Sequence, residues 1–296
     1  MQNNKPFPRP VWVEAEFLSP PQREICRTLF RGQDSSCGLT VIDLRAIETE
    51  LCPPVQAFVA TYLDPIEQET YATFSFAKRR LEWFGGRIAA KMAAMAVMAG
   101  GTKRPPSFLD IRVETEATGR PSLRGKTTEG VNLPHISISH SHGLAGAIAT
   151  QGRSCGLDLQ QITPKVLTVR DRFMTRDEWA IIHANPSLRG QDEATLLTLL
   201  WAAKESVRKA IACQPLLGFT EITLCRLEGE LALGLSGHFT SPRLASPPAP
   251  FFLVKRGGFA CAMTVQDPAA LPLRSENLSA TALSKSSSLA VIPACF

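Results

Sequence analysis

Helical and strand-like stretches alternate irregularly along this chain, and their order limits the fold classes open to it. A helical pattern runs from about Pro65 to Gly100, and helical patterns return at 176–184 and 195–212. Between and after them lie short apolar runs bounded by turn residues, which predict strands. Because no regular strand–helix–strand repeat is present, this order favours an α+β fold over a doubly wound sheet. Residues 1–60 mix short apolar stretches with Pro and Gly, which predicts strands and turns.

The composition is that of a globular protein. Of the 296 residues, 44% are hydrophobic and 20% charged, enough for a large core in one or two domains. The start lacks a secretory signal and the longest apolar run is too short for a bilayer, so we expect a cytoplasmic protein without a membrane partner. The eight cysteines contain no C-x-x-C pair, which favours reduced core thiols. The Ser/Ala-rich residues 268–296 are expected to be a disordered tail.

Positive charge is concentrated in one part of the chain. The net charge is +5, but the stretch from Lys78 to Lys126 holds eleven Lys and Arg against four Asp and Glu, a net charge of +7. Such a segment suggests an anionic partner: a nucleic acid, a phosphorylated ligand or an acidic protein. A solvated helix face is the other interpretation, and charge alone does not separate the two.

The strongest local signal is LLWAAKESVRKAI at 199–211. Its apolar residues recur at helical spacing, and Glu205 and Lys209 lie four residues apart on a neighbouring stripe. Spacing alone also allows an ordinary surface ion pair, worth about 0.3–0.5 kcal/mol.

A second signal is CGLDLQQI at 155–162, an apolar strand that contains Asp158. A carboxylate in such a strand requires a donor or a metal ion, unless it lies at the strand's end. Gln160 shares its face because strand side chains alternate. Asp158 and Glu205 together would give hard oxygen ligands of the kind that Mg²⁺ prefers, with room for water and phosphate oxygens.

Histidines and cations complete the set of candidates. HISISHSHG at 135–143 lacks a G-x-S-x-G elbow for a hydrolase, and His140 with His142 lacks the further ligands of a zinc site. A histidine that contacts phosphate at a strand end, or one with a structural role, remains. The helical sequence KRRLEWFGGRIAAKMAA at 78–94 is basic. Within it, Arg87 and Lys91 lie one helical step apart and could bind one anionic group between them.

An internal echo suggests a duplication. Trp83, Arg87 and Lys91 share their four-residue spacing with Trp201, Glu205 and Lys209, and 118 residues separate the two sets. Three matched positions fit a chain of two similar halves without establishing it.

Four blocks together resemble the 4′-phosphopantetheinyl transferase superfamily in its larger, monomeric form. They are RRLEWFGGRIAAK at 79–91, GRP at 119–121 with ISISHS at 136–141, CGLDLQQI at 155–162, and WAAKESVRKA at 201–210. FMTRDEW at 173–179 resembles a lesser element of that family. The Gly-x-Asp strand followed by the Trp-x-x-Lys-Glu helix is the specific part of the match.

The resemblance implies two α+β halves related by a pseudo-twofold, residues 1–150 and 151–267, with the active site in the cleft between them. It implies transfer of the 4′-phosphopantetheine arm of coenzyme A to a serine of an apo acyl or peptidyl carrier protein, releasing 3′,5′-ADP. Asp158, Glu205 and Gln160 would bind Mg²⁺. Glu205 would also act as the base, and Lys209 would stabilise the leaving group. The implied coenzyme A contacts are Arg80, Arg87, Arg120, Ser139 and His140.

Gln160 departs from the family pattern, since many relatives have a second acidic residue there. Two other interpretations stay open. One is a non-catalytic homologue that binds coenzyme A; the other is a nucleic-acid-binding protein, although the basic segment lacks a stacking platform and a known motif. A monomer is expected because both halves lie in one chain.

Overall fold

The computed structural model describes residues 17–30, 37–50, 55–99, 106–125, 132–211, 216–242 and 248–267, so the tail expected at 268–296 lies outside the described residues. The elements up to residue 150 are α1 (Pro20–Leu29), β1 (Cys37–Asp43), α2 (Leu44–Glu50), α3 (Val55–Tyr62), α4 (Pro65–Ala72), α5 (Ala77–Met98), β2 (Ile111–Thr115), β3 (Pro121–Gly125), β4 (His135–Ser141) and β5 (Leu144–Thr150).

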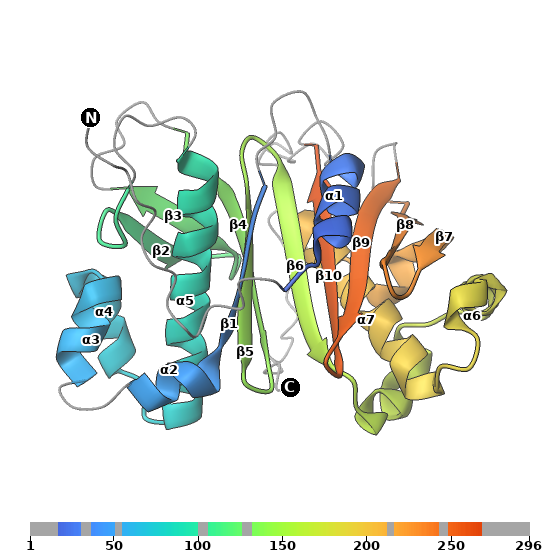
Figure 1. The fold of residues 1–296 in the computed structure, drawn as a ribbon, viewed down its shortest axis with the longest axis horizontal. Helices are drawn as coiled ribbons and strands as arrows, with labels where there is room; N and C mark the ends of the chain where they lie inside the picture. The colour runs from blue at the N-terminus through green and yellow to red at the C-terminus, as the bar shows by residue number, and fades with distance from the viewer. Residues whose placement is uncertain are drawn as a thin grey trace, which may run out of the picture.

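The remaining elements repeat most of that order (Figure 1). They are β6 (Ser154–Gln161), the 3₁₀ segment η1 (Pro164–Arg172), α6 (Arg176–Ala184), η2 (Pro186–Leu188), α7 (Glu193–Ile211), η3 (Phe219–Glu221), β7 (Thr223–Glu230), β8 (Gly234–Thr240), β9 (Ala249–Arg256) and β10 (Phe259–Gln266). In each set one strand precedes short helices, a long helix and four more strands.

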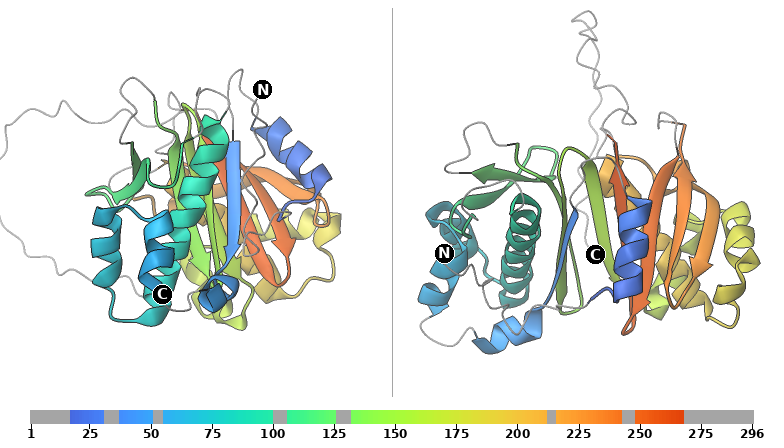
Figure 2. Two further views of the ribbon diagram at one scale, coloured as in Figure 1. Left: turned by 60° about the vertical axis from the view of Figure 1, so that its left-hand side comes forward. Right: turned by 45° about the horizontal axis from the view of Figure 1, so that its top comes forward.

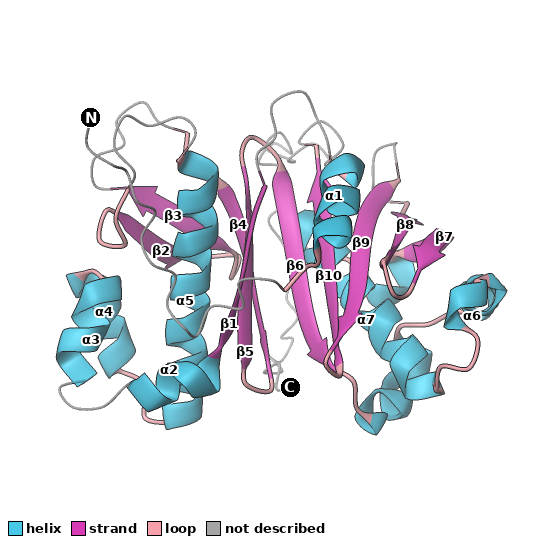
Figure 3. Ribbon diagram, viewed as in Figure 1, coloured by secondary structure: helices cyan, strands magenta, loops and turns pink. Residues whose placement is uncertain are grey.

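The strands form antiparallel sheets in the middle of the molecule, with most helices at its two ends (Figure 3). The first half has the sheet β1-β5-β4 beside the hairpin β2-β3, and the second has the sheet β6-β10-β9-β8-β7. Helix α5 packs on β5 and β1, and α7 packs on β6 and β10. The expected α+β class is therefore confirmed. Among the described helices, none combines the length and apolarity needed to cross a bilayer.

A third core lies between the two sheets and is covered by α1 (Figure 2). Alternation along the strands separates it from the other two: Leu157 and Leu159 of β6 belong to this central core, whereas Gly156 approaches α7. Three of the five described cysteines are buried and all five are free thiols: Cys26, Cys37, Cys155, Cys225 and Cys261.

Each half contains the same buried ion pair. In the first half, Lys91 Nζ donates to Glu67 and to the carbonyls of Tyr62 and Phe108 at 2.5, 2.8 and 3.0 Å. In the second, Lys204 Nζ donates to Glu178 and to the carbonyls of Phe173 and Phe219, the last at 3.0 Å.

The surroundings of these pairs also repeat. Each glutamate caps the start of its own helix, in capping boxes with Asp64 and Thr175, and each accepts a hydrogen bond from the backbone of the following hairpin. The two halves are therefore copies of one architecture.

These pairs correct the internal echo. Lys91 corresponds to Lys204, 113 residues later, so matching Lys91 with Lys209 at a separation of 118 is wrong for the helices. The separation of 118 does hold for the first strands. Gly38 of β1 approaches Ala93 of α5 as Gly156 of β6 approaches Ser206 of α7. The repeated tripeptide Cys-Gly-Leu at 37–39 and 155–157 was the usable signal in the sequence.

The prediction of strands and turns for residues 1–60 is only partly right. The strand at β1 is present, but α1, α2 and α3 are helices. Helix α1 begins at Pro20 and Pro21, and proline suits the first turn of a helix. Ser19 and Gln22 then form a capping box at that start.

Candidate functional site

The site is built where α7 lies against β6. Gly156 permits this contact, because a Cβ there would overlap the carbonyl oxygen of Ser206 and lie 2.7 Å from the amide nitrogen of Ala210. Asp158 is two residues further along β6 and therefore faces the same helix. The close approach brings the strand carboxylate to the polar stripe of α7.

Asp158 is 6% exposed and its two oxygens differ. Oδ1 accepts hydrogen bonds from Lys209 Nζ at 2.7 Å and from Ser139 Oγ at 3.1 Å. Oδ2 is buried and has no hydrogen-bond partner. A buried oxygen of this kind carries a desolvation cost unless something outside the chain binds it.

Glu205 and Lys209 come from successive turns of α7. Lys209 Nζ also donates to the carbonyl of Leu157 at 2.9 Å, and Glu205 Oε1 accepts from Arg208 at 2.7 Å. Burial raises the pKa of Glu205, and the Asp158 carboxylate raises it further, whereas Lys209 and Arg208 lower it. The structure thus brings Asp158, Glu205, Lys209 and Ser139 into one cluster.

His140 follows Ser139 on β4 and lies beside the same cluster. Its Nδ1 is 3.8 Å from Glu82 Oε2 of α5. Burial lowers the pKa of His140, and Lys209 and Arg79 lower it further, whereas Glu82 and Asp158 raise it. Arg79 and Glu82 were not among the residues selected from the sequence, although their three-residue spacing places them on one helix face.

Arg80 and Arg87 have different neighbours. The Arg80 guanidinium lies 5.5 Å from the centre of the Tyr71 ring. The Arg87 guanidinium lies 3.9 Å from the Trp83 ring, and burial lowers its pKa to about 10, opposed by Glu67. Of the adjacent arginines, Arg79 and not Arg80 is the one that acts on His140.

Arg120 and Gln160 contact or occupy β6 on either side of Asp158. The Arg120 guanidinium donates to Ser154 Oγ at 2.8 Å. Ser154 is four residues before Asp158 on β6, and the two are therefore about 13 Å apart along the strand. Gln160 lies two residues after Asp158 on the same face and is partly exposed. The predicted set therefore spreads along β6 and does not converge on one point.

The residues at Asp158 fit a hard divalent cation. Two carboxylates are present, and Asp158 Oδ2 is an orphaned buried oxygen. Among the described residues, no group of three His, Cys, Asp or Glu side chains has the spacing of a metal cage. Two protein carboxylates with water and phosphate oxygens are what Mg²⁺ accepts, whereas structural zinc requires four protein ligands.

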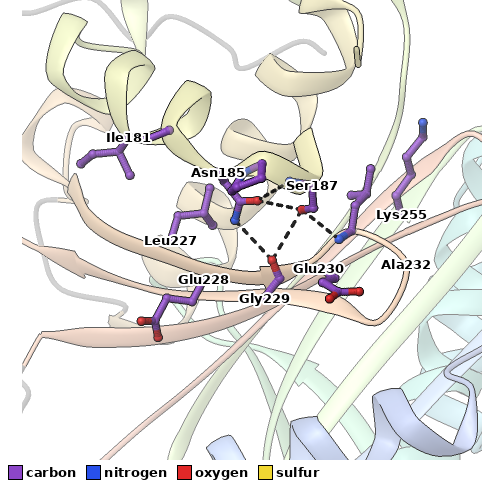
Figure 4. Close-up of a pocket in the computed structure, with 12 residues that line it drawn as sticks. Ile181, Asn185, Ser187, Leu227, Glu228, Gly229, Glu230, Ala232 and Lys255 are labelled. Carbon is purple, nitrogen blue, oxygen red and sulfur yellow. Dashed lines mark hydrogen bonds between the residues drawn. The ribbon is translucent and has the colours of Figure 1, made fainter. Parts of the chain in front are cut away.

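A hollow on the surface lies away from this cluster (Figure 4). It measures about 1060 Å³ and lies between the end of α6, η2 and the β7–β8 hairpin, where Asn185 and Ser187 hydrogen-bond to the carbonyl of Gly229. None of the residues in the Asp158 cluster lines it.

Comparisons with known proteins identify the family. The model of the 4′-phosphopantetheinyl transferase superfamily matches residues 154–244. The holo-[acyl-carrier-protein] synthase of Exiguobacterium sibiricum is 35% identical over 118 residues, which are 88% of that protein and 40% of this chain. This chain belongs to the 4′-phosphopantetheinyl transferase superfamily. The match to the family model, residues 154–244, lies in the second half and contains Asp158, Glu205 and Lys209.

Other superfamily members show similar likeness. The holo-[acyl-carrier-protein] synthase of Bacillus cytotoxicus is 33% identical over 119 residues, 96% of that protein and 40% of this chain. A solved holo-(acyl-carrier-protein) synthase from Bacillus anthracis, in complex with CoA (3′,5′-ADP), is 32% identical and covers 38% of this chain and 92% of its own, with a TM-score of 0.33.

Proposed function

We propose that this protein transfers the 4′-phosphopantetheine arm of coenzyme A to a serine of an apo acyl or peptidyl carrier protein and releases 3′,5′-ADP. The observation that carries the proposal is the Asp158–Lys209–Glu205 cluster inside the part of the chain that matches the superfamily. The relatives named as holo-[acyl-carrier-protein] synthases support the same reaction.

The metal assigned to this site is Mg²⁺. Asp158 Oδ2 and Glu205 would hold it, and Gln160, two residues after Asp158 on β6, would be the third ligand. When bound, it supplies positive charge against the pyrophosphate of coenzyme A. Gln160 is a weaker ligand than a carboxylate, so water is expected to fill part of the coordination shell.

Glu205 is assigned as the general base. Its side chain is 20% exposed, so an incoming hydroxyl can reach it. Its raised pKa brings it closer to the pH at which a base works best. It takes the proton of the carrier serine while the serine oxygen forms a bond to the phosphorus that bears the pantetheine arm. The bond from that phosphorus to the oxygen of 3′,5′-ADP breaks.

Lys209 is assigned to the departing phosphate. Two of its three ammonium protons are directed at Asp158 and the Leu157 carbonyl. Its side chain is 31% exposed, which leaves the third donor for a phosphate oxygen. Arg79, Arg120 on its turn, and Arg80 and Arg87 on α5 supply further positive charge for the coenzyme phosphates. His140 is assigned as a phosphate contact beside Arg79.

The comparison of the halves supports one site per chain. Aligning Gly38 of β1 with Gly156 of β6 matches Thr40 with Asp158. Aligning Lys91 of α5 with Lys204 of α7 matches Met92 with Glu205. The first half therefore lacks both carboxylates. We propose that residues 1–150 supply phosphate contacts and residues 151–267 the carboxylates. One such chain, working in the cytoplasm as a monomer, is expected to be sufficient.

The test separates catalysis from binding alone. Coenzyme A affinity would be measured by calorimetry, and release of 3′,5′-ADP by chromatography after adding an apo carrier protein and Mg²⁺. Release that depends on both the carrier and the metal supports the transferase. Binding without release from several acyl and peptidyl carriers would instead support a non-catalytic coenzyme A-binding protein.

A further inference from the structure

Three serines of β4 connect the two halves. Ser137, Ser139 and Ser141 are buried, and their hydroxyls accept hydrogen bonds from the backbone amides of Leu157, Leu159 and Gln161 at 3.1, 3.0 and 3.1 Å. On both strands these residues are two positions apart, so all three lie on the same side of their strand. The amides of β6 that they contact point away from β10, the strand that pairs with the other side of β6. The edge of one sheet is thereby satisfied by side chains from the edge of the other.

Ser139 has a second contact that distinguishes it within this ladder. Its hydroxyl donates to Asp158 Oδ1 at 3.1 Å, whereas Ser141 contacts the ring of His142. A serine hydroxyl has one proton to donate, so this bond commits that proton to Asp158. Donation to a coenzyme phosphate would require giving up the carboxylate.

These contacts hold the Asp158 carboxylate in one orientation. Oδ1 is held from two directions, by Ser139 of the first half and by Lys209 of α7. A carboxylate fixed at one oxygen has its other oxygen in a defined place, and that oxygen is the unpartnered Oδ2. Groups that orient a metal ligand in this way typically change metal affinity about 10–100-fold when they are removed.

We propose that Ser139 is a positioning residue, which fixes the Asp158 carboxylate across the boundary between the halves so that Oδ2 meets the divalent cation. The inference rests on the proposed function, because it takes Asp158 as a metal ligand. It differs from the expectation that Ser139 contacts the nucleotide, since the two roles change different affinities.

The test uses Mn²⁺ as the probe, with free Mn²⁺ measured by electron paramagnetic resonance in the presence of saturating coenzyme A. Ser139→Ala is expected to weaken Mn²⁺ binding about 10-fold or more and to leave coenzyme A affinity within a factor of two. Ser139→Thr keeps the hydroxyl and is expected to restore Mn²⁺ affinity. Ser137→Ala is the matched control, because it removes the same kind of bond to β6 without touching Asp158.

Urea unfolding of both alanine variants completes the design. Both are expected to lower the unfolding midpoint, Ser139→Ala by more because it also loses the bond to Asp158, while Ser139→Ala alone changes Mn²⁺ binding. The inference is overturned if Ser137→Ala and Ser139→Ala weaken Mn²⁺ binding equally, or if Ser139→Ala weakens coenzyme A binding alone. If the wild type binds no Mn²⁺, or if Asp158→Asn leaves Mn²⁺ binding unchanged, the metal site of the proposed function fails together with the inference.

Discussion

Lys204 tests the structural argument most sharply, because it stands directly before the proposed base in the sequence and yet points away from the site. Its side chain and that of Glu178 are 0% exposed, and they are 2.7 Å apart. Lys204→Met keeps the length of the side chain and removes the charge. Glu178 would retain the amides of Leu224 and Thr175, both at 2.9 Å, but it would lose its cation.

The expected loss follows from this geometry. Removing one partner of a buried pair costs about 3–5 kcal/mol, since an uncompensated charge stays behind. That is a large share of a free energy of unfolding of about 5–15 kcal/mol. Lys91→Met in the first half should cost a similar amount, because the same three kinds of partner surround it. Adding Glu178→Gln to Lys204→Met should recover part of the loss.

The assay is urea unfolding followed by tryptophan fluorescence and circular dichroism, with coenzyme A affinity measured on the folded protein. Trp201 packs against Phe173 and Phe219 around this pair and reports on it. Wild-type stability of Lys204→Met would refute the argument. So would a folded Lys204→Met variant that loses coenzyme A affinity, because that result would make the lysine a ligand contact.

The remaining predictions concern the site and its supports. Asp158→Asn and Glu205→Gln are each expected to lower turnover by about 10²–10⁴-fold at saturating Mg²⁺ in a transfer assay, with unfolding midpoints close to wild type; turnover within threefold of wild type would contradict these roles. Gly156→Ala should cost about 1–3 kcal/mol or more in urea unfolding, and it should reduce transfer because it separates β6 from α7. Gly38→Ala is its control: a similar clash with Ala93 should destabilise the protein and leave the Asp158 cluster intact, so equal losses of transfer in both variants would count against the argument. Burial lowers the pKa of His140 in the folded protein, so its unfolded form binds protons more readily and stability should fall as the pH drops below about 6.5. His140→Gln should flatten that part of the stability curve, and NMR titration should show the pKa of His140 rising when 3′,5′-ADP binds; an unchanged pKa would remove His140 from the phosphate contacts.

Local patterns in the sequence were sufficient for the central elements. The apolar spacing of 199–211 gives α7, and the apolar run around Asp158 gives β6. Residue type and position made Asp158 a candidate, because a carboxylate inside an apolar strand needs a donor or a metal ion. Glu205 became a candidate as the helix carboxylate that could complete the same site. The structure adds that these two elements pack directly on each other.

The remaining features depend on contacts between segments that are distant in the sequence, and local patterns do not predict such contacts. The partners of Lys91 and Lys204 are a glutamate and backbone carbonyls from other segments of the chain, so spacing on the helix alone led to the wrong match with Lys209. The effect of Arg79 on the pKa of His140 depends on the packing of α5 beside β4, a contact between elements that are distant in the sequence. The second bond of Ser139 depends on how two sheet edges meet, a contact between strands that are not hydrogen-bonded neighbours in either sheet.

The measurement that tests the account most directly is the intact mass of an apo acyl carrier protein after incubation with this protein, coenzyme A and Mg²⁺. The account predicts a gain of one phosphopantetheine, which EDTA abolishes and which Asp158→Asn and Glu205→Gln nearly eliminate. An unchanged mass across acyl and peptidyl carriers, from wild-type protein that binds coenzyme A, would contradict it.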